Sequence, residues 1–352
     1  MCTRILNTIH PDFPVTSRNM DWFWPVNAAL FTFPEGERRN GLSEAAREHF
    51  KLEQCDVFSW VSKYASIASV MGDENTDYST IDGMNAPGLV VNALYDSDSS
   101  YGELKHPMGK SVLSALRWAQ FVLDSFATVA QTTAYFRAVP FRLISQPVPD
   151  HSEMQAALHL AISDRHGDSA VIEVRQGIFQ IHHNSADRIV TNQPDYNTQQ
   201  TLTQYWQYQW GISPARNPHP TRYSVPGGNS ATQHFERASF YLTFSKPATS
   251  HPAVIAQTRS LAATCAVPMH FNPENSERAS YSIWTNLSDP IGQRYYFIDT
   301  ETIAPAWLSF SQAISQCRKV TVQQESPTAT GLEIRTGDLQ DLLTPCANPY
   351  LG

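Results

Sequence analysis

The sequence predicts an α+β protein in which antiparallel sheets and helices form separate layers. Strand patterns occur in groups that are joined by short turns, and helical patterns fall between these groups. The chain has 352 residues, of which 41% are hydrophobic, so it can bury a large core. It contains no internal repeat, no low-complexity tract and no convincing domain boundary. We therefore expect a single domain over residues 2–352.

The first unit is an N-terminal hairpin. Residues 3–10 and 15–20 have the composition of strands, and the segment between them, Pro-Asp-Phe-Pro, is turn-forming. Cys2 therefore opens the first strand. Arg18 and Asp21 lie on the partner strand or just beyond it.

Two further antiparallel units show alternating apolar and polar residues between turn-forming residues. Their expected strands are 157–163, 169–175 and 178–182 in a meander, and 281–287 and 294–299 in a hairpin. Apolar residues at helical spacing predict the other layers. The expected helices are 111–126, 128–136, a segment that starts near Ser230 and runs through Leu242, and residues 205–210. The Pro-rich segment 214–226 is typical of a surface loop.

Charge and cysteine content argue against several classes of protein. The net charge is −8 and the pI is near 5.8, whereas a nucleic-acid partner needs a concentrated positive surface. No stretch approaches ~18 consecutive apolar residues, so the sequence predicts no membrane-spanning helix. The N-terminus also lacks the pattern of a signal peptide. The five cysteines are scattered and suit neither a disulfide framework nor a zinc site. We expect a reducing, cytoplasmic compartment; a lost leader peptide would instead indicate the periplasm.

Cys2 is the leading candidate for chemistry. Methionine aminopeptidase removes Met1 when the next side chain is small, and the mature chain would then begin with a thiol and a free α-amine on one carbon. Free thiols have a pKa of about 8.5, and α-amines have one of about 7.7 to 8.0. A terminal side chain that is activated by its own amine is an established acyl-transfer nucleophile.

Several short blocks, taken together and in order, resemble the choloylglycine hydrolase and penicillin V acylase family of cysteine N-terminal-nucleophile hydrolases. The blocks are Met-Cys-Thr at the start, Arg18-Asn19-Met20-Asp21-Trp22, Asp82-Gly83-Met84-Asn85, residues 118–124, Thr191-Asn192-Gln193-Pro194, Pro226-Gly227-Gly228 and Phe235-Glu236-Arg237-Ala238. The resemblance covers residues 2–300. It implies a four-layer αββα sandwich of two antiparallel sheets, with the active site at the edge between them.

The resemblance also implies roles for individual residues. Cys2 would attack a carbonyl carbon, with its own α-amine as the base. Arg18 would favour the thiolate, and Asp21 would orient the amine. The amide of Asn192 and the backbone N–H of Tyr95 would donate to the oxyanion, where one donor is typically worth ~2.7 to 4 kcal/mol.

Further expectations concern the late block and the acyl pocket. His234 stands where the family has a catalytic-site arginine, and Arg237 matches a second arginine of that block. Because histidine has an unperturbed pKa near 6.5, His234 would carry little charge at pH 7. Trp22 and Trp24 would line an apolar pocket for the acyl group, and His234 would contact the substrate.

The expected activity is hydrolysis of a linear amide bond through a thioester acyl-enzyme, without cofactor or metal. The pair His182-His183 lacks a third ligand at metal spacing and is interpreted as structural.

The substrate would be a small molecule with a bulky apolar acyl group. Tyr95 favours penicillin V or N-acyl homoserine lactones; conjugated bile salts are the alternative. A non-catalytic binding protein is the alternative of another class. The resemblance implies a homo-oligomer, either a tetramer or a dimer, and autoprocessing.

Overall fold

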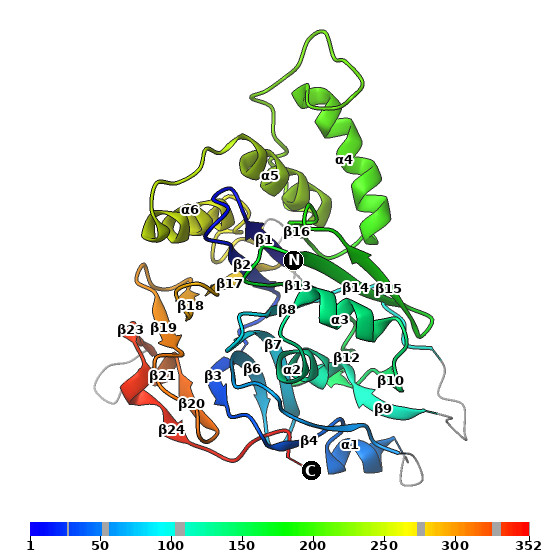
Figure 1. Cartoon of the computed structure of the whole chain (residues 1–352), viewed down its shortest axis with the longest axis vertical. Helices are drawn as coiled ribbons and strands as arrows, with labels where there is room; N and C mark the ends of the chain where they lie inside the picture. Colours follow the sequence, from blue (N-terminus) through cyan, green and yellow to red (C-terminus); the bar gives the residue numbers. More distant parts are fainter. Residues whose placement is uncertain (27, 51–55, 103–109, 273–278, 326–331, 352) are drawn as a thin grey trace.

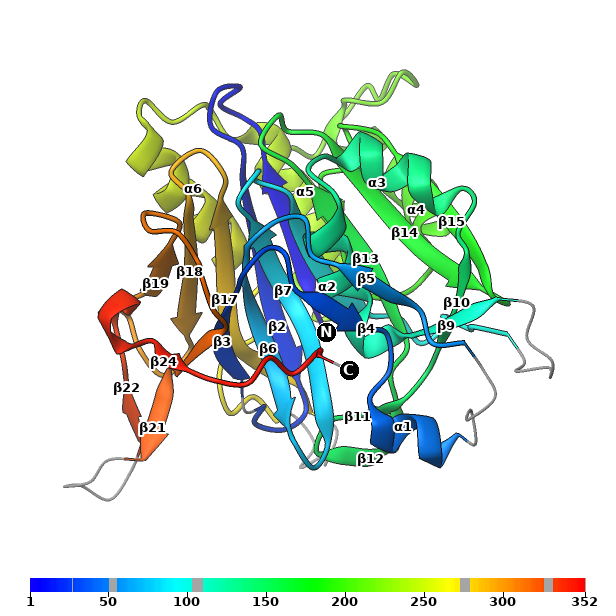
Figure 2. The ribbon, with the colours of Figure 1, turned by 60° about the horizontal axis from the view of Figure 1, so that its bottom comes forward.

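Two β-sheets stacked face to face form the body of the molecule, and helices cover their outer faces (Figure 1, Figure 2). The computed structural model describes residues 1–26, 28–50, 56–102, 110–272, 279–325 and 332–351. The α+β prediction and the four-layer αββα arrangement implied by the sequence are confirmed.

The larger sheet has nine strands within the described residues, and each pair of neighbours is antiparallel. Their spatial order is β15 (Ile178–His183), β14 (Ser169–Arg175), β13 (Leu158–Ser163), β8 (Val90–Tyr95), β7 (Asp77–Asn85), β6 (Ser66–Asp73), β3 (Ala28–Phe33), β20 (Arg318–Thr321) and β24 (Thr344–Pro345). The meander predicted from alternating residues is confirmed as β13, β14 and β15.

The smaller sheet has seven strands in the described part of the chain and is antiparallel except for its last pair. Its order is β16 (Ile189–Val190), β1 (Thr3–Asn7), β2 (Val15–Trp22), β17 (Tyr281–Asp289), β18 (Arg294–Asp299), β19 (Ala306–Ser309) and β23 (Gly337–Asp338). Both predicted hairpins, β1–β2 and β17–β18, are confirmed, and they lie side by side in this sheet.

The outer layers are helical. α2 and α3 pack on the larger sheet, whereas α5 and α6 pack on the smaller one. The helices are α1 (Glu44–His49), α2 (Ala115–Ser125), α3 (Val129–Phe136), α4 (Tyr196–Trp210), α5 (Ala231–Phe244), α6 (His251–Ala263) and the 3₁₀ helix η1 (Gln340–Leu342). In Figure 1, α4 and the loop after it project from the body at the top. Short ladders complete the fold: β4 (Arg38–Asn40) with β5 (Ser59–Val61), β9 (Ser111–Ser114) with β10 (Phe141–Ile144), β11 (Pro147–Val148) with β12 (His151–Gln155), and β21 (Gln323–Glu325) with β22 (Leu332–Ile334).

One predicted element needs correction. The helix expected over 111–126 begins only at Ala115, because its first four residues form β9 and pair in parallel with β10. The side chain of Ser114 accepts a hydrogen bond from the N–H of Leu116 and so caps the helix at this point. The apolar residues that predicted this helix therefore belong to a strand as well as to a helix.

The N-terminal hairpin lies in the interior of the fold. β1 and β2 are flanked by β16 and β17, and every residue of both strands is buried. One face of the hairpin meets α5 and α6, and the apolar residues of the other face join the core between the sheets. Polar side chains on these strands are therefore removed from water and need partners within the protein. This requirement sets the geometry around Cys2.

Candidate active site

Cys2 lies directly before β1 and is 1% exposed. In the hairpin register Arg4 is opposite Arg18, which brings the Arg18 side chain near the sulfur. Arg18 Nη2 is 3.2 Å from Cys2 Sγ. The sequence-based expectation that Arg18 faces Cys2 across the hairpin therefore agrees with this contact.

Arg18 is itself fixed from three sides. Its Nη1 pairs with Asp82 Oδ2 at 3.0 Å, and Nη2 also donates to the carbonyl of Ala93 at 3.2 Å. Burial alone would lower the pKa of this guanidinium, but the negative charges of Asp82, Cys2 and Asp21 outweigh it and raise the pKa. Arg18 is thus a permanent, immobilised positive charge in contact with the sulfur.

Asp21 is the second-last residue of β2 and lies next to the N-terminal residue of the chain. Its Oδ2 is 3.9 Å from the α-amine of Met1, and its Oδ1 accepts a 2.5 Å hydrogen bond from Ser282 of β17. Burial raises the pKa of Asp21 to about 6, although the terminal amine, Ser282 and Arg18 each oppose the shift. Asp21 is therefore ionised at neutral pH and placed to hold an amine at the start of the chain.

Asn192 links Cys2 to the strand that ends at Tyr95. Its Oδ1 accepts from the backbone N–H of Cys2, and its Nδ2 donates to the carbonyl of Tyr95, both at 2.5 Å. An amide nitrogen carries two donors, so one N–H of Asn192 is free of this bond. The N–H of Asp96 donates to the carbonyl of Ala157, the residue before β13. Because backbone groups alternate along a strand, the N–H of Tyr95 points to the other side, where Asn192 lies.

His234 and Arg237 both lie on α5 but have different hydrogen-bond partners. His234 is fully buried on α5, with Nδ1 3.1 Å from Thr3 Oγ1 and 3.9 Å from Asp21 Oδ2. Burial lowers its pKa to about 3, so it is neutral at pH 7. Arg237 instead donates to the carbonyls of Pro226 and Gly228, at 3.2 and 3.1 Å. Its hydrogen bonds therefore hold the loop before α5 rather than Cys2.

An apolar cavity of about 50 Å³ opens at the sulfur. Cys2 and Arg18 lie on its wall together with Trp22 and Tyr95, whose rings meet edge to face with centroids 5.6 Å apart. The rest of the lining is mostly aliphatic and consists of Met20, Met71, Ser79, Ile81, Ala93, Leu116, Val148, Pro149, Ala156 and Leu158. Trp24 is not part of this wall; it packs on Trp22 and against the ring of His151.

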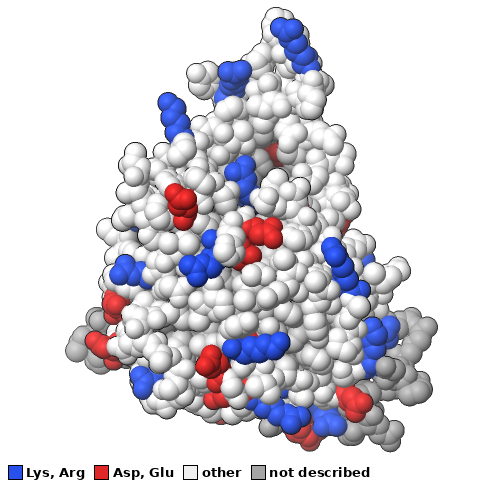
Figure 3. Space-filling view, in the orientation of Figure 1, with Lys and Arg blue, Asp and Glu red and all other residues white. Residues whose placement is uncertain are grey.

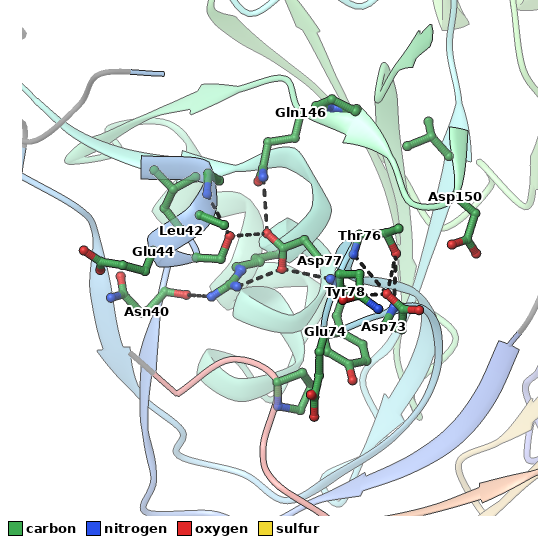
Figure 4. Close-up of a pocket in the computed structure, with 18 of the residues that line it drawn as sticks. Asn40, Leu42, Glu44, Asp73, Glu74, Thr76, Asp77, Tyr78, Gln146 and Asp150 are labelled. Atoms are coloured by element: carbon green, nitrogen blue, oxygen red, sulfur yellow. Dashed lines mark hydrogen bonds and ion pairs between the residues drawn. The ribbon is translucent and has the colours of Figure 1, made fainter. Parts of the chain in front are cut away.

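A second cavity, of about 840 Å³, lies between α1 and the tip of the β6–β7 hairpin (Figure 4). It contains none of the candidate residues. The carboxylate of Asp77 at its centre accepts hydrogen bonds from Arg117, Ser43 and Gln146. This carboxylate is satisfied by its neighbours, and the thiol on the wall of the cavity, Cys346, lies beside Cys317 rather than beside an arginine.

Two residues of the site were missed by sequence reasoning. Asp82 pairs with Arg18, and Ser282 bonds Asp21, although they lie 64 and 261 residues away in the chain. Asp82 stands in a block that the sequence comparison singled out, but nothing in the block indicated its partner. Ser282 belongs to no recognisable sequence motif, and an isolated serine on a strand is too common to indicate a role.

Other features bear on the excluded classes. On the face shown in Figure 3, Lys and Arg side chains are scattered among Asp and Glu and form no continuous basic patch. No helix within the described residues is long and apolar enough to span a membrane. Cys265, Cys317 and Cys346 are free thiols, as is Cys2; Cys55 lies outside the described residues.

Known proteins are similar to this chain in sequence and in fold. The model of the linear amide C–N hydrolases, choloylglycine hydrolase family, matches residues 2–317. A penicillin V acylase from Pectobacterium atrosepticum is 32% identical over 311 residues, which cover 84% of this chain and 77% of the acylase. The structure of penicillin V acylase from Agrobacterium tumefaciens matches with a TM-score of 0.80 and 28% identity over 99% of each chain. A conjugated bile acid hydrolase from Clostridium perfringens matches with a TM-score of 0.67 and 16% identity over 100% of this chain and 98% of its own, which concerns the fold alone.

Proposed function

Because the chain belongs to the choloylglycine hydrolase family of linear amide C–N hydrolases and is an amide hydrolase, we propose that Cys2 is its nucleophile. The observation that carries the proposal is the 3.2 Å contact between Arg18 Nη2 and Cys2 Sγ. A fixed positive charge in a buried site stabilises negative charge on sulfur. The described thiols of Cys265 and Cys317 differ from Cys2, because burial raises the pKa of both: Cys265 also interacts with Arg237, and Cys317 lies next to Cys346.

The proposed reaction begins once Met1 has been removed. The free α-amine of Cys2 accepts the thiol proton, and the thiolate adds to the substrate carbonyl. The oxyanion that forms accepts hydrogen bonds from the Asn192 amide and the Tyr95 backbone N–H. The C–N bond then breaks, the ammonium gives its proton to the leaving amine, and a thioester remains. Water, deprotonated by the same amine, attacks the thioester, releases the acid and restores the thiol.

The apolar cavity supports an acyl group that is flat or straight. Its volume of about 50 Å³ lies well below the range of roughly 300–1,000 Å³ that is usual for ligand pockets. A flat phenoxy ring or an unbranched fatty acyl chain has a smaller cross-section than a steroid acyl group, so it needs less widening of this apolar cavity. We therefore favour penicillin V or N-acyl homoserine lactones over conjugated bile salts as substrates.

Intact-mass analysis with a panel of these three amide classes tests the proposal. An active enzyme will lack Met1, and a mass increase equal to the acyl group will map to Cys2. A substrate-like electrophile should label Cys2 alone and quickly. If the protein binds the ligands, releases no amine and is not labelled at Cys2, it is instead a non-catalytic member of the fold.

The assembly of the protein is a further part of the proposal. Several apolar side chains are exposed on α4 and the loop after it, which project from the body in Figure 1: Leu202, Tyr205, Tyr208, Ile212 and Tyr223. Exposed apolar surface that is gathered in one place is typical of contact sites. It supports a homo-oligomer, and the mass of the protein in solution tests this, because a monomer would contradict it.

The pH dependence of hydrolysis should report on Asp21. Burial raises its pKa to about 6, so the carboxylate becomes protonated below this pH and no longer holds the amine. We expect kcat/KM to fall as the pH drops through about 6. Ser282→Ala removes a donor that lowers the pKa of Asp21, so it should move the fall to higher pH. Ser280→Ala is the matched control, since Ser280 bonds the Met1 amine and not Asp21.

The same shift has a consequence for stability. A carboxyl whose pKa is higher in the folded state contributes stability below its ordinary pKa of 3.8, and this contribution is lost as the pH rises through about 6. A shift of this size corresponds to roughly 3 kcal/mol. Asp21→Asn should therefore be inactive yet raise the free energy of unfolding at pH 7 in urea titrations. A lower free energy of unfolding would contradict the assignment of an ionised, buried Asp21.

Asn192→Ala should reduce kcat by ~10²-fold or more, because it removes one oxyanion donor. The effect should appear in kcat rather than in KM, since the donor acts on charge that develops only in the transition state. Steady-state kinetics on the preferred amide measure both. An unchanged kcat would remove Asn192 from the proposed oxyanion hole.

A further inference from the structure

A buried ionic cluster lies beside the two segments that carry the proposed oxyanion donors. It contains Asp96, His159, Glu173 and Arg175, which come from the end of β8 and from the adjacent strands β13 and β14. The first three side chains are at most 2% exposed. None of these residues was singled out by the sequence, and none contacts Cys2.

Arg175 joins the two carboxylates of the cluster. Its Nη1 is 2.6 Å from Asp96 Oδ2, and its Nη2 is 3.0 Å from Glu173 Oε1. Glu173 and Arg175 are two residues apart on β14, so their side chains leave the same face of the strand. The planar guanidinium presents its donors in a fixed fork, which makes the separation of the two carboxylates a defined distance.

Each carboxylate also holds a backbone segment. Asp96 directly follows Tyr95, and its two oxygens accept hydrogen bonds from the N–H of Asp98 and the hydroxyl of Ser99. Glu173 Oε1 accepts from the N–H of Tyr196, the first residue of α4 and the fourth after Asn192. The chain on one side of Arg175 therefore leads to Tyr95, and the chain on the other side leads to Asn192.

We propose that Arg175 is a positioning residue for amide hydrolysis, because its fork between Asp96 and Glu173 sets the distance between the Tyr95 and Asn192 oxyanion donors. This inference rests on the proposed function, since it assumes that these two groups stabilise the oxyanion. The two segments are joined directly by the hydrogen bond from Asn192 Nδ2 to the Tyr95 carbonyl. A donor that is displaced by about 1 Å can lower a rate by ~10²-fold, so a rigid brace behind this bond matters for catalysis.

The cluster also has the composition of a metal site, and its geometry argues against that reading. Ligand atoms of Asp96, His159 and Glu173 all lie within 4.8 Å of one another. However, the guanidinium of Arg175 already contacts both carboxylates and supplies their positive charge. A metal ion would have to displace Arg175 from two short contacts.

The test is a double-mutant cycle between Arg175 and Asn192. Arg175→Met should lower kcat by ~10²-fold with KM little changed. In the Asn192→Ala background the same substitution should have almost no further effect on kcat, because the pair of donors whose spacing Arg175 sets no longer exists. Arg175→Lys keeps the charge but loses the fork, and it should recover only part of kcat. If Arg175→Met is too unstable to purify, Asp96→Asn replaces it in the test. Asparagine has nearly the shape of aspartate but loses the charge that pairs with Arg175, so this variant should also lower kcat.

Arg39→Met is the matched control. Arg39 is also buried between two carboxylates, with Nη1 2.6 Å from Glu37 and Nε 3.2 Å from Asp124, but it lies away from Cys2. It should lower the free energy of unfolding and leave kcat unchanged. The brace is refuted if Arg175→Met multiplies its full effect on top of Asn192→Ala, or if it acts only through KM. If Asn192→Ala alone has no effect, the proposed oxyanion hole is wrong instead.

Discussion

Cys2→Ala is expected to abolish amide hydrolysis and to leave the fold intact. The sulfur is the proposed nucleophile, and no other described thiol lies beside Arg18. Truncation removes one buried atom, while Arg18 keeps its contacts with Asp82 and the Ala93 carbonyl. The surroundings of the site should therefore keep their shape. Amine release, measured on the preferred substrate, should fall to the uncatalysed rate, and the circular dichroism spectrum should be unchanged.

Two companion variants sharpen this prediction. Cys2→Ser should be far slower than the wild type, because a hydroxyl is a poorer nucleophile near neutral pH. Cys317→Ala removes a buried thiol that lies next to Cys346 rather than at the site, and it should keep full activity. Substantial hydrolysis by Cys2→Ala, or equal rates for serine and cysteine, would exclude direct attack by sulfur.

Arg18→Met is expected to damage both stability and activity, and a second substitution should separate the two effects. The change strands the carboxylate of Asp82, which is 0% exposed and pairs with Arg18 at 3.0 Å. Removing one partner of a buried ion pair typically costs about 3–5 kcal/mol. The sulfur also loses the positive charge that contacts it, so alkylation of Cys2 at neutral pH and kcat/KM should both fall.

Adding Asp82→Asn to Arg18→Met removes the stranded charge. The free energy of unfolding should then recover, because Asn92 can still donate to an oxygen at position 82. Activity should not recover, since no positive charge faces Cys2. Urea titrations, alkylation rates and kcat/KM of the two single variants and the double variant complete the comparison. Recovery of activity in the double variant would mean that Arg18 acts only through the fold.

The sequence was most informative where chemistry is local. The β1–β2 hairpin followed from turn residues between two segments with the composition of strands, and it brought the side chain of Arg18 to Cys2 from the partner strand. Strands with an alternating pattern, such as β13 and β14, were recognised for the same reason. The central strands β6, β7 and β8 were not singled out. Both of their faces are covered, so they are almost entirely buried and show no clear alternation.

The residues of the candidate site also differ in how well the sequence predicted their contacts. The block around Asn192 indicated a polar group that could reach the sulfur, and the structure brings its amide to the backbone of Cys2. The expectation that Arg237 joins this group finds no support in its hydrogen bonds, which go to Pro226 and Gly228. A position in a sequence block cannot say which way a long side chain turns from a helix.

The sequence by itself determined the fold class, the family and the residue that we propose as nucleophile, because these depend on short-range patterns and on the order of blocks. Only the tertiary structure decided which groups surround that residue: Asp82 against Arg18, Ser282 against Asp21, and Arg175 between Asp96 and Glu173. The physical reason is that buried charges must find partners wherever two sheets and their edges meet. Those meetings join segments that are far apart in the chain, and a one-dimensional pattern does not record them.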